Sequence, residues 1–206
     1  MIEKTIHYKK YYIPRKGYRY EKGQFWQLIS EMNQKEETSE WLVEHLTSQP
    51  TGEIEDYEIH FQTALKESYT SSLWAAAYII FGGCSDDLFD YFRGWLIACG
   101  QETFEAVIQN PENLANLIPA YYKEEEIIPE CEEILSVALE AFSLQETGDT
   151  EWDDDIWDTF DSLLDEKGHD SSMPEIEFDW EEDDEEGLAK RFPKLWERFG
   201  ENPLFY

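Results

Sequence analysis

One stretch of the sequence, residues 73–81, reads LWAAAYIIF and contains no charged side chain. A helix that is apolar on all sides is buried in a protein core, so we expect this stretch to form the central helix of the fold. Ser71 or Ser72 is a natural cap for its start. Gly82 and Gly83 follow it, as glycines do where helices end.

Apolar residues recur at helical spacing on both sides of this stretch. The spacing predicts helices at 25–32, 38–50, 53–69, 85–100, 102–109, 111–118, 129–145 and 152–164, with one or two closing helices at 182–199. Because 206 residues suit one domain, we predict a mainly α, single-domain, multi-helix orthogonal bundle. The helical domain would span residues 24–200, leaving a short tail of 201–206.

Residues 1–23 are basic and rich in tyrosine. They contain seven Lys or Arg against Glu3 and Glu21, which gives a net charge of +5. Pro14 and Gly17 indicate a turn, so we expect a short β-hairpin or an extended arm. An arm that folds onto the acidic body of its own chain would be a structural clamp, and one that reaches a neighbouring chain would favour a homodimer.

The rest of the chain is strongly acidic. The whole chain has a net charge of −31, and residues 145–187 hold twenty Asp or Glu against Lys167 alone, a charge of −19 in 43 residues. Contact with phosphates requires clustered Lys and Arg, so direct binding to nucleic acid or to an anionic membrane is disfavoured. A surface of this kind attracts basic partners instead.

Tryptophans are interleaved with these acids, and two interpretations stay open. Trp152, Trp157 and Phe160 keep helical spacing, which is typical of a core stripe. Alternatively, the aromatic residues anchor a basic protein partner while the carboxylates accelerate encounter, as in an immunity protein, an inhibitor or a nucleic-acid mimic. The candidate partner-binding residues are Trp152, Asp153, Asp154, Asp155, Trp157, Trp180, Glu181, Glu182, Asp183 and Asp184.

A second candidate site lies at the start of the helix predicted at 85–100. Asp86, Asp90 and Arg93 can share one helical face, and arginine binds carboxylate or phosphate in a bidentate manner. This hypothesis makes the chain an enzyme or a small-ligand sensor; the alternative is a capped helix start with an ordinary ion pair. The candidate ligand-binding residues are Trp74, Cys84, Asp86, Asp87, Asp90, Arg93 and Trp95.

Motifs for metals, cofactors and targeting are absent from the sequence. The three cysteines have no CxxC spacing and the four histidines no HExxH spacing, so we predict no disulfide framework, no metal site and no cofactor. We find no nucleotide-binding or hydrolase loop, no signal peptide and no apolar run long enough to span a membrane. Reduced thiols indicate a cytoplasmic location.

The run LWAAAYIIFGGCSDDLFDYFRGWLIACG at 73–100, followed by PENLA at 111–115, resembles the bacterial family called domain of unknown function 4240. The motifs FWQLI at 25–29 and FPKLWERFG at 192–200 resemble the ends of that family, so the resemblance covers about residues 24–200. It implies a helical bacterial domain and no established activity. Of the two hypotheses, we favour the protein-binding module over the enzyme.

Overall fold

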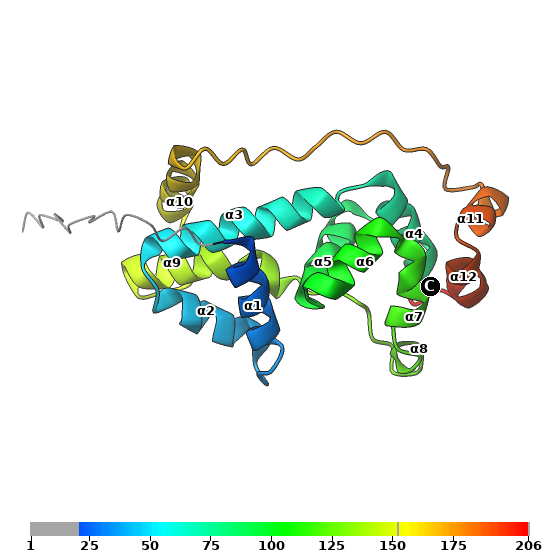
Figure 1. Cartoon of the computed structure of the whole chain (residues 1–206), viewed down its shortest axis with the longest axis horizontal. Helices are drawn as coiled ribbons and strands as arrows, with labels where there is room; N and C mark the ends of the chain where they lie inside the picture. The colour runs from blue at the N-terminus through cyan, green and yellow to red at the C-terminus, as the bar shows by residue number, and fades with distance from the viewer. Residues whose placement is uncertain (1–20, 152, 206) are drawn as a thin grey trace, which may run out of the picture.

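The computed structural model describes residues 21–151 and 153–205 of the chain. Every regular element in these ranges is helical, which confirms the prediction of a mainly α, multi-helix bundle (Figure 1). The predicted β-hairpin or arm falls almost wholly in residues 1–20, outside the described ranges. None of the helices in 21–151 and 153–205 is long and apolar enough to cross a membrane.

The helices follow one another along the chain with short connections, except before α11. They are α1 (Lys22–Met32), α2 (Thr38–Thr47), α3 (Thr51–Ser68), α4 (Ser71–Phe81), α5 (Asp86–Ala98), α6 (Gln101–Gln109), η1 (Pro111–Asn113), α7 (Leu114–Leu117), α8 (Tyr121–Glu124), η2 (Glu133–Leu135), α9 (Val137–Thr147), α10 (Asp154–Glu166), α11 (Glu185–Arg191), α12 (Pro193–Leu195) and η3 (Trp196–Gly200).

Helix α4 is the most deeply buried element, as its composition predicts. Eight of its eleven residues are buried. The prediction of Ser71 or Ser72 as the cap is wrong, because the helix begins at Ser71 and the side chain of Thr70 accepts the hydrogen bond from the backbone N–H of Leu73. Gly82 ends the helix with a φ of 76°, a left-handed conformation that favours glycine.

Helix α5 packs closely against the segment that precedes α9. A Cβ atom on Gly94 would lie 2.7 Å from the carbonyl oxygen of Cys131. The backbone N–H of Cys131 donates a 3.0 Å hydrogen bond to the carbonyl oxygen of Tyr91. The prediction of one helix over 129–145 is therefore wrong at its start: the backbone at 131 bonds to α5 instead of to its own helix, and α9 begins only at Val137.

Helix α10 covers α3 and α9 at one end of the molecule. The rings of Phe142 and Phe160 stack with their centroids 4.9 Å apart. Lys167, just after α10, pairs with Glu55 at 2.8 Å and with Asp56 at 2.6 Å, both on α3. These contacts fix the helix that carries much of the acidic segment.

Residues 168–183, which we call the strap, run without regular structure from α10 to α11 across the length of the molecule (Figure 1). The strap is attached to α4 near its far end. The indole Nε1 of Trp180 donates a 3.0 Å hydrogen bond to the carbonyl oxygen of Ser71, and the ring of Phe178 meets that of Trp74 edge to face at 5.2 Å. An ion pair of 2.8 Å joins Asp179 to Arg191 of α11.

Candidate functional site

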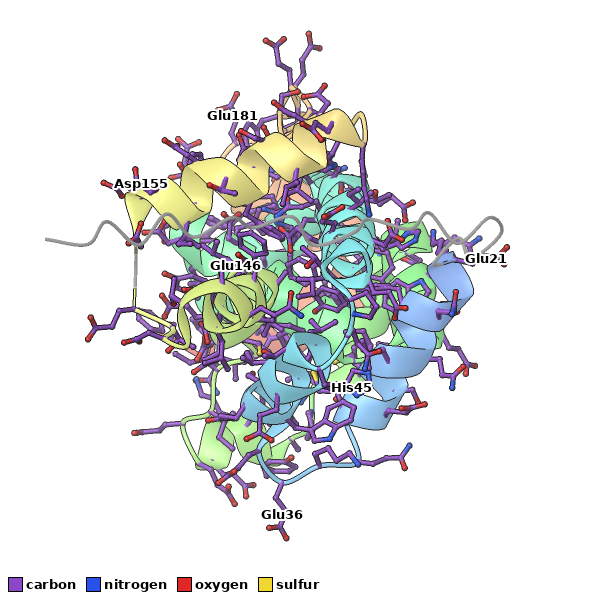
Figure 2. The ribbon with its side chains drawn as sticks, turned by 90° about the vertical axis from the view of Figure 1, so that its left-hand side faces the viewer. Glu21, Glu36, His45, Glu146, Asp155 and Glu181 are labelled. Carbon is purple, nitrogen blue, oxygen red and sulfur yellow. The ribbon has the colours of Figure 1, made fainter. Side chains whose placement is uncertain are left out.

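A groove of about 940 Å³ lies between α2, α3, η2, α9 and α10, with the first residues of the strap at its border. Figure 2 views the molecule from this end, where α10 lies above α9 and α2 lies below it. Segments that are far apart in the sequence therefore contribute to one concave surface, which we call the acidic groove.

The acidic groove contains many carboxylates and no cationic side chain. Among the described residues, seven acidic residues line the groove, and no lysine or arginine does. One of the seven, Glu58, is buried. The other six, which we call the rim carboxylates, are half-buried or exposed and are Glu40, Glu44, Glu132, Glu133, Glu140 and Asp161.

Glu58 projects from α3 and is only 8 % exposed. Its Oε1 accepts a 2.7 Å hydrogen bond from Nε2 of Gln62, one helical turn further along α3. Burial raises the pKa of Glu58 from 4.5 to about 7, against the opposing effect of that hydrogen bond. Among the described residues no cation pairs with Glu58, whereas the equally buried Glu55 is paired with Lys167.

Neighbouring hydroxyl groups hold two of the rim carboxylates in place. The hydroxyl of Tyr91 on α5 donates a 3.0 Å hydrogen bond to Glu132, and the hydroxyl of Ser136 donates a 2.5 Å hydrogen bond to Glu140. His169 of the strap also lines the groove, and burial together with Lys66 lowers the pKa of its imidazole. The lowered pKa favours the uncharged form of the imidazole, which does not neutralise the carboxylates.

Apolar side chains form much of the remaining wall, beside polar residues such as Ser39, Gln62 and Thr150. The apolar side chains come from α2, η2, α9 and α10 and are Val43, Leu135, Leu139, Trp157, Phe160 and Leu164. Trp157 is 44 % exposed, one of the few large apolar side chains of the described residues to reach the solvent. An exposed aromatic residue beside carboxylates is the combination that the sequence suggested for partner binding.

The other predicted partner-binding residues lie in two separate places. On α10, Asp154 and Asp155 are exposed in the first turn, and Asp153 caps the helix by accepting from the backbone N–H groups of residues 155 and 156. Trp152 lies outside the described residues. Near α11, Trp180 is half-buried against α4.

The four acids that follow Trp180 do not lie in the acidic groove. Glu181, Glu182 and Asp183 are exposed, and Asp184 caps α11 by accepting a 2.9 Å hydrogen bond from the backbone N–H of Gly187. The structure therefore brings Trp157 into the groove and gives Trp180 a packing role at the far end of the strap.

The Asp/Arg cluster of α5 is arranged around a buried arginine. Arg93 is 2 % exposed, and its Nη1 donates a 2.6 Å hydrogen bond to the carbonyl oxygen of Leu65. Its Nη2 pairs with Asp90, while its guanidinium carbon lies 4.9 Å from the ring centroid of Tyr69 and 5.0 Å from that of Phe89. The predicted ion pair between Asp90 and Arg93 is confirmed.

The remaining residues of this cluster differ in how deeply they are buried. Asp86 and Asp87 are exposed in the first turn of α5. Trp74 is buried and Trp95 half-buried in the core. Burial and the carboxylates of Asp86 and Asp90 raise the pKa of Cys84 to about 12, so its thiol stays protonated at neutral pH. A ligand-binding role for this cluster stays a prediction.

Sequence reasoning overlooked Glu58, although the sequence contains a signal for it. Ile54, Tyr57, Phe61 and Leu65 form the buried stripe of α3, and position 58 lies within that stripe at the spacings i+4 and i−3. A carboxylate on the apolar face of a helix is rare unless it is paired.

A model of the family described as "Protein of unknown function (DUF4240)" matches residues 21–143. No curated protein and no solved structure matches the chain. The matched residues include the groove walls formed by α2, α3 and η2 and end within α9. The resemblance of residues 192–200 to the end of the family lies beyond the match and stays a prediction.

Proposed function

The chain belongs to the DUF4240 family, and we propose that it is an acidic protein-binding module that captures a basic protein partner in the acidic groove. Such a module would be an immunity protein, an inhibitor or a nucleic-acid mimic. The observation that supports the proposal is the groove itself, whose lining among the described residues combines seven carboxylates, no lysine or arginine, and the exposed ring of Trp157.

The physical basis of the proposal is a division of roles within one surface. A large aromatic side chain that becomes buried on binding supplies much of the binding energy of an interface. Carboxylates around it steer a basic partner toward the site and disfavour acidic partners. Additional exposed acids on α10, among them Asp154 and Asp155, extend the negative surface beyond the groove. The association should therefore weaken as the salt concentration rises.

The proposal includes a cytoplasmic location. All three cysteines, Cys84, Cys99 and Cys131, are free thiols. Burial is the largest cause that raises the pKa of each of them, which disfavours the reactive thiolate. Free, unreactive cysteines are typical of proteins that work in a reducing compartment.

Two triple variants of the full chain test the proposal, and each removes three negative charges. One changes the groove (Glu40→Gln, Glu44→Gln and Glu132→Gln), and the other changes the surface near α11 (Glu181→Gln, Glu182→Gln and Asp183→Asn). Proteins captured from host lysate by the unaltered chain are identified by mass spectrometry, purified and remeasured with both variants. We expect a basic protein whose affinity falls at least about tenfold with the groove variant alone.

Two outcomes would contradict the proposal. If both triple variants weaken binding equally, the partner responds to net charge and not to the groove. If no purified basic protein binds at low or moderate salt, the chain has a different function. Trp157→Ala is the additional check, because the aromatic anchor should matter even when every charge is kept.

A further inference from the structure

Glu58 is a buried carboxylate with which no cation pairs in the part of the chain that the structure describes. Its equally buried neighbour on α3, Glu55, is paired with Lys167 at 2.8 Å. Glu58 has only the neutral amide of Gln62, at 2.7 Å, among the described residues. Removing a carboxylate from water without a cation is unfavourable, so a cation that enters the groove would recover part of that free energy.

The surroundings of Glu58 favour one kind of cation. One carboxylate oxygen accepts from Gln62, so a guanidinium fork, which needs both oxygens, is poorly matched, whereas a compact ammonium needs only one. Apolar side chains such as Val43, Phe160 and Leu164 line the same groove and suit a four-carbon stem. We infer that Glu58 binds the ammonium group of one lysine side chain of the partner, so that the groove recognises an inserted lysine and not positive charge in general.

This inference deepens the proposed function and rests on it. The metal alternative lacks the required geometry, because no group of three or more Asp, Glu, His or Cys in the described ranges is arranged to hold an ion. The rim carboxylates would attract a basic surface, and the lysine that reaches Glu58 would fix the position of the partner in the groove.

Binding of an ammonium to Glu58 should be linked to a proton. Because the pKa of Glu58 is about 7, a large fraction of this carboxyl is protonated at neutral pH. Only the ionised form attracts a cation, so the apparent affinity should rise roughly tenfold between about pH 6 and about pH 8. The other titratable groups that line the groove are the six rim carboxylates, Tyr91 and His169. The pKa of Tyr91 is raised from its ordinary value of 10.0, farther from this interval, and that of His169 is lowered from its ordinary value of 6.5, toward the acidic end of the interval.

The test uses n-butylammonium as a probe for the lysine side chain, with n-butylguanidinium and n-butanol for comparison. The reporter is the side-chain amide resonance of Gln62 in NMR spectra of the full chain, since this group touches Glu58. We expect saturable shifts with a Kd of about 1 to 10 mM for the ammonium, weaker binding of the guanidinium, and no saturable effect of the alcohol. The ammonium should bind roughly tenfold more tightly at about pH 8 than at about pH 6.

The variant Glu58→Gln keeps the shape of the side chain and should abolish the saturable shift, while Glu181→Gln, far from the groove, should leave it unchanged. The inference is overturned if the ammonium does not bind, if the guanidinium binds as tightly, if Glu58→Gln binds equally well, or if the unaltered chain shows no pH dependence. If a purified basic partner needs the rim carboxylates but not Glu58, the proposed function holds and the lysine site does not. If n-butylammonium binds at Glu58 but no basic protein binds the chain, the ammonium site exists and the proposed function fails.

Discussion

The Nη1 of Arg93 on α5 donates a 2.6 Å hydrogen bond to the carbonyl oxygen of Leu65 on α3. Leu65 lies in the last turn of α3, where the backbone carbonyls have no backbone N–H partner one turn further along the helix. This carbonyl also accepts a 2.9 Å hydrogen bond from the hydroxyl of Ser68, and Arg93 adds a second donor that ties α5 to α3. The rings of Tyr69 and Phe89 lie near its guanidinium, which completes a packed environment for the charge.

Arg93→Ala should lower the free energy of unfolding by about 3 kcal/mol, because it removes both the buried stem and the donor to Leu65. Arg93→Met keeps most of the aliphatic stem, so it should lower the free energy of unfolding by clearly less than Arg93→Ala does. Urea denaturation of both variants measures the difference. Arg191→Met, at a more exposed ion pair, is the control and should change the stability by less than about 1 kcal/mol. An unchanged Arg93→Ala variant would show that the arginine does not hold α5 to α3.

Gly94→Ala should destabilise the fold through overpacking. The added methyl group would lie 2.7 Å from the carbonyl oxygen of Cys131 and 3.0 Å from Cγ2 of Ile134, so α5 and η2 would have to separate. We expect a loss of about 1 to 3 kcal/mol, measured by thermal or urea unfolding. Gly23→Ala is the matched control, since no atom of the described residues lies within 4 Å of its Cβ position, and alanine there should stabilise α1 by up to about 1 kcal/mol.

Local signals were sufficient to predict much of the helical framework. The uncharged run of α4, the left-handed turn at Gly82 and the cap at Ser85, whose hydroxyl accepts from the backbone N–H of Leu88 at 3.2 Å, all depend on residues near in sequence. The start of α9 was not predictable in this way. It depends on the hydrogen bond between residues 131 and 91, a contact that no periodicity within 129–145 encodes.

The acidic groove was predicted only in part for the same reason. Trp157 was a candidate because an aromatic residue among acids is visible in the sequence itself. Glu58 of α3, Tyr91 of α5 and Glu132, just before η2, are far apart in the sequence, and only the packing of these parts of the chain brings them to one surface. Trp180 shows the converse: its acidic neighbours suggested a partner, and the fold uses its ring to hold the strap on α4.

Trp180→Ala should release the strap without unfolding the bundle. The variant loses the 3.0 Å hydrogen bond to Ser71 and the ring contact with Tyr78, while the core helices keep their own contacts. Cleavage by a glutamate-specific protease after Glu175 or Glu177 should become roughly tenfold faster, as expected for the loss of about 1 to 2 kcal/mol of local stability. Met173→Ala, at an exposed position of the same strap, should not alter the cleavage rate. Equal rates for the two variants would mean that Trp180 does not anchor the strap.

Glu58→Gln should make the stability of the protein less dependent on pH. The pKa of Glu58 is raised from 4.5 to about 7 on folding, so the folded state binds the proton more tightly than the unfolded state does. The resulting stabilisation is complete below about pH 4.5 and is lost as the pH rises through about 7. Glutamine stays neutral throughout, so the variant should match the unaltered chain near pH 4.5 and exceed it by about 3 kcal/mol near pH 8.5.

Urea denaturation of both proteins at several pH values measures this difference. Glu181→Gln, at an exposed position, should follow the unaltered chain at every pH. Saturating n-butylammonium should narrow the gap at high pH, because it would stabilise the ionised Glu58 and has no carboxylate to bind in the variant. If the two stability curves run parallel from pH 4.5 to 8.5, the carboxyl of Glu58 is hydrated in the folded state, and the unpaired buried charge on which the lysine site depends does not exist.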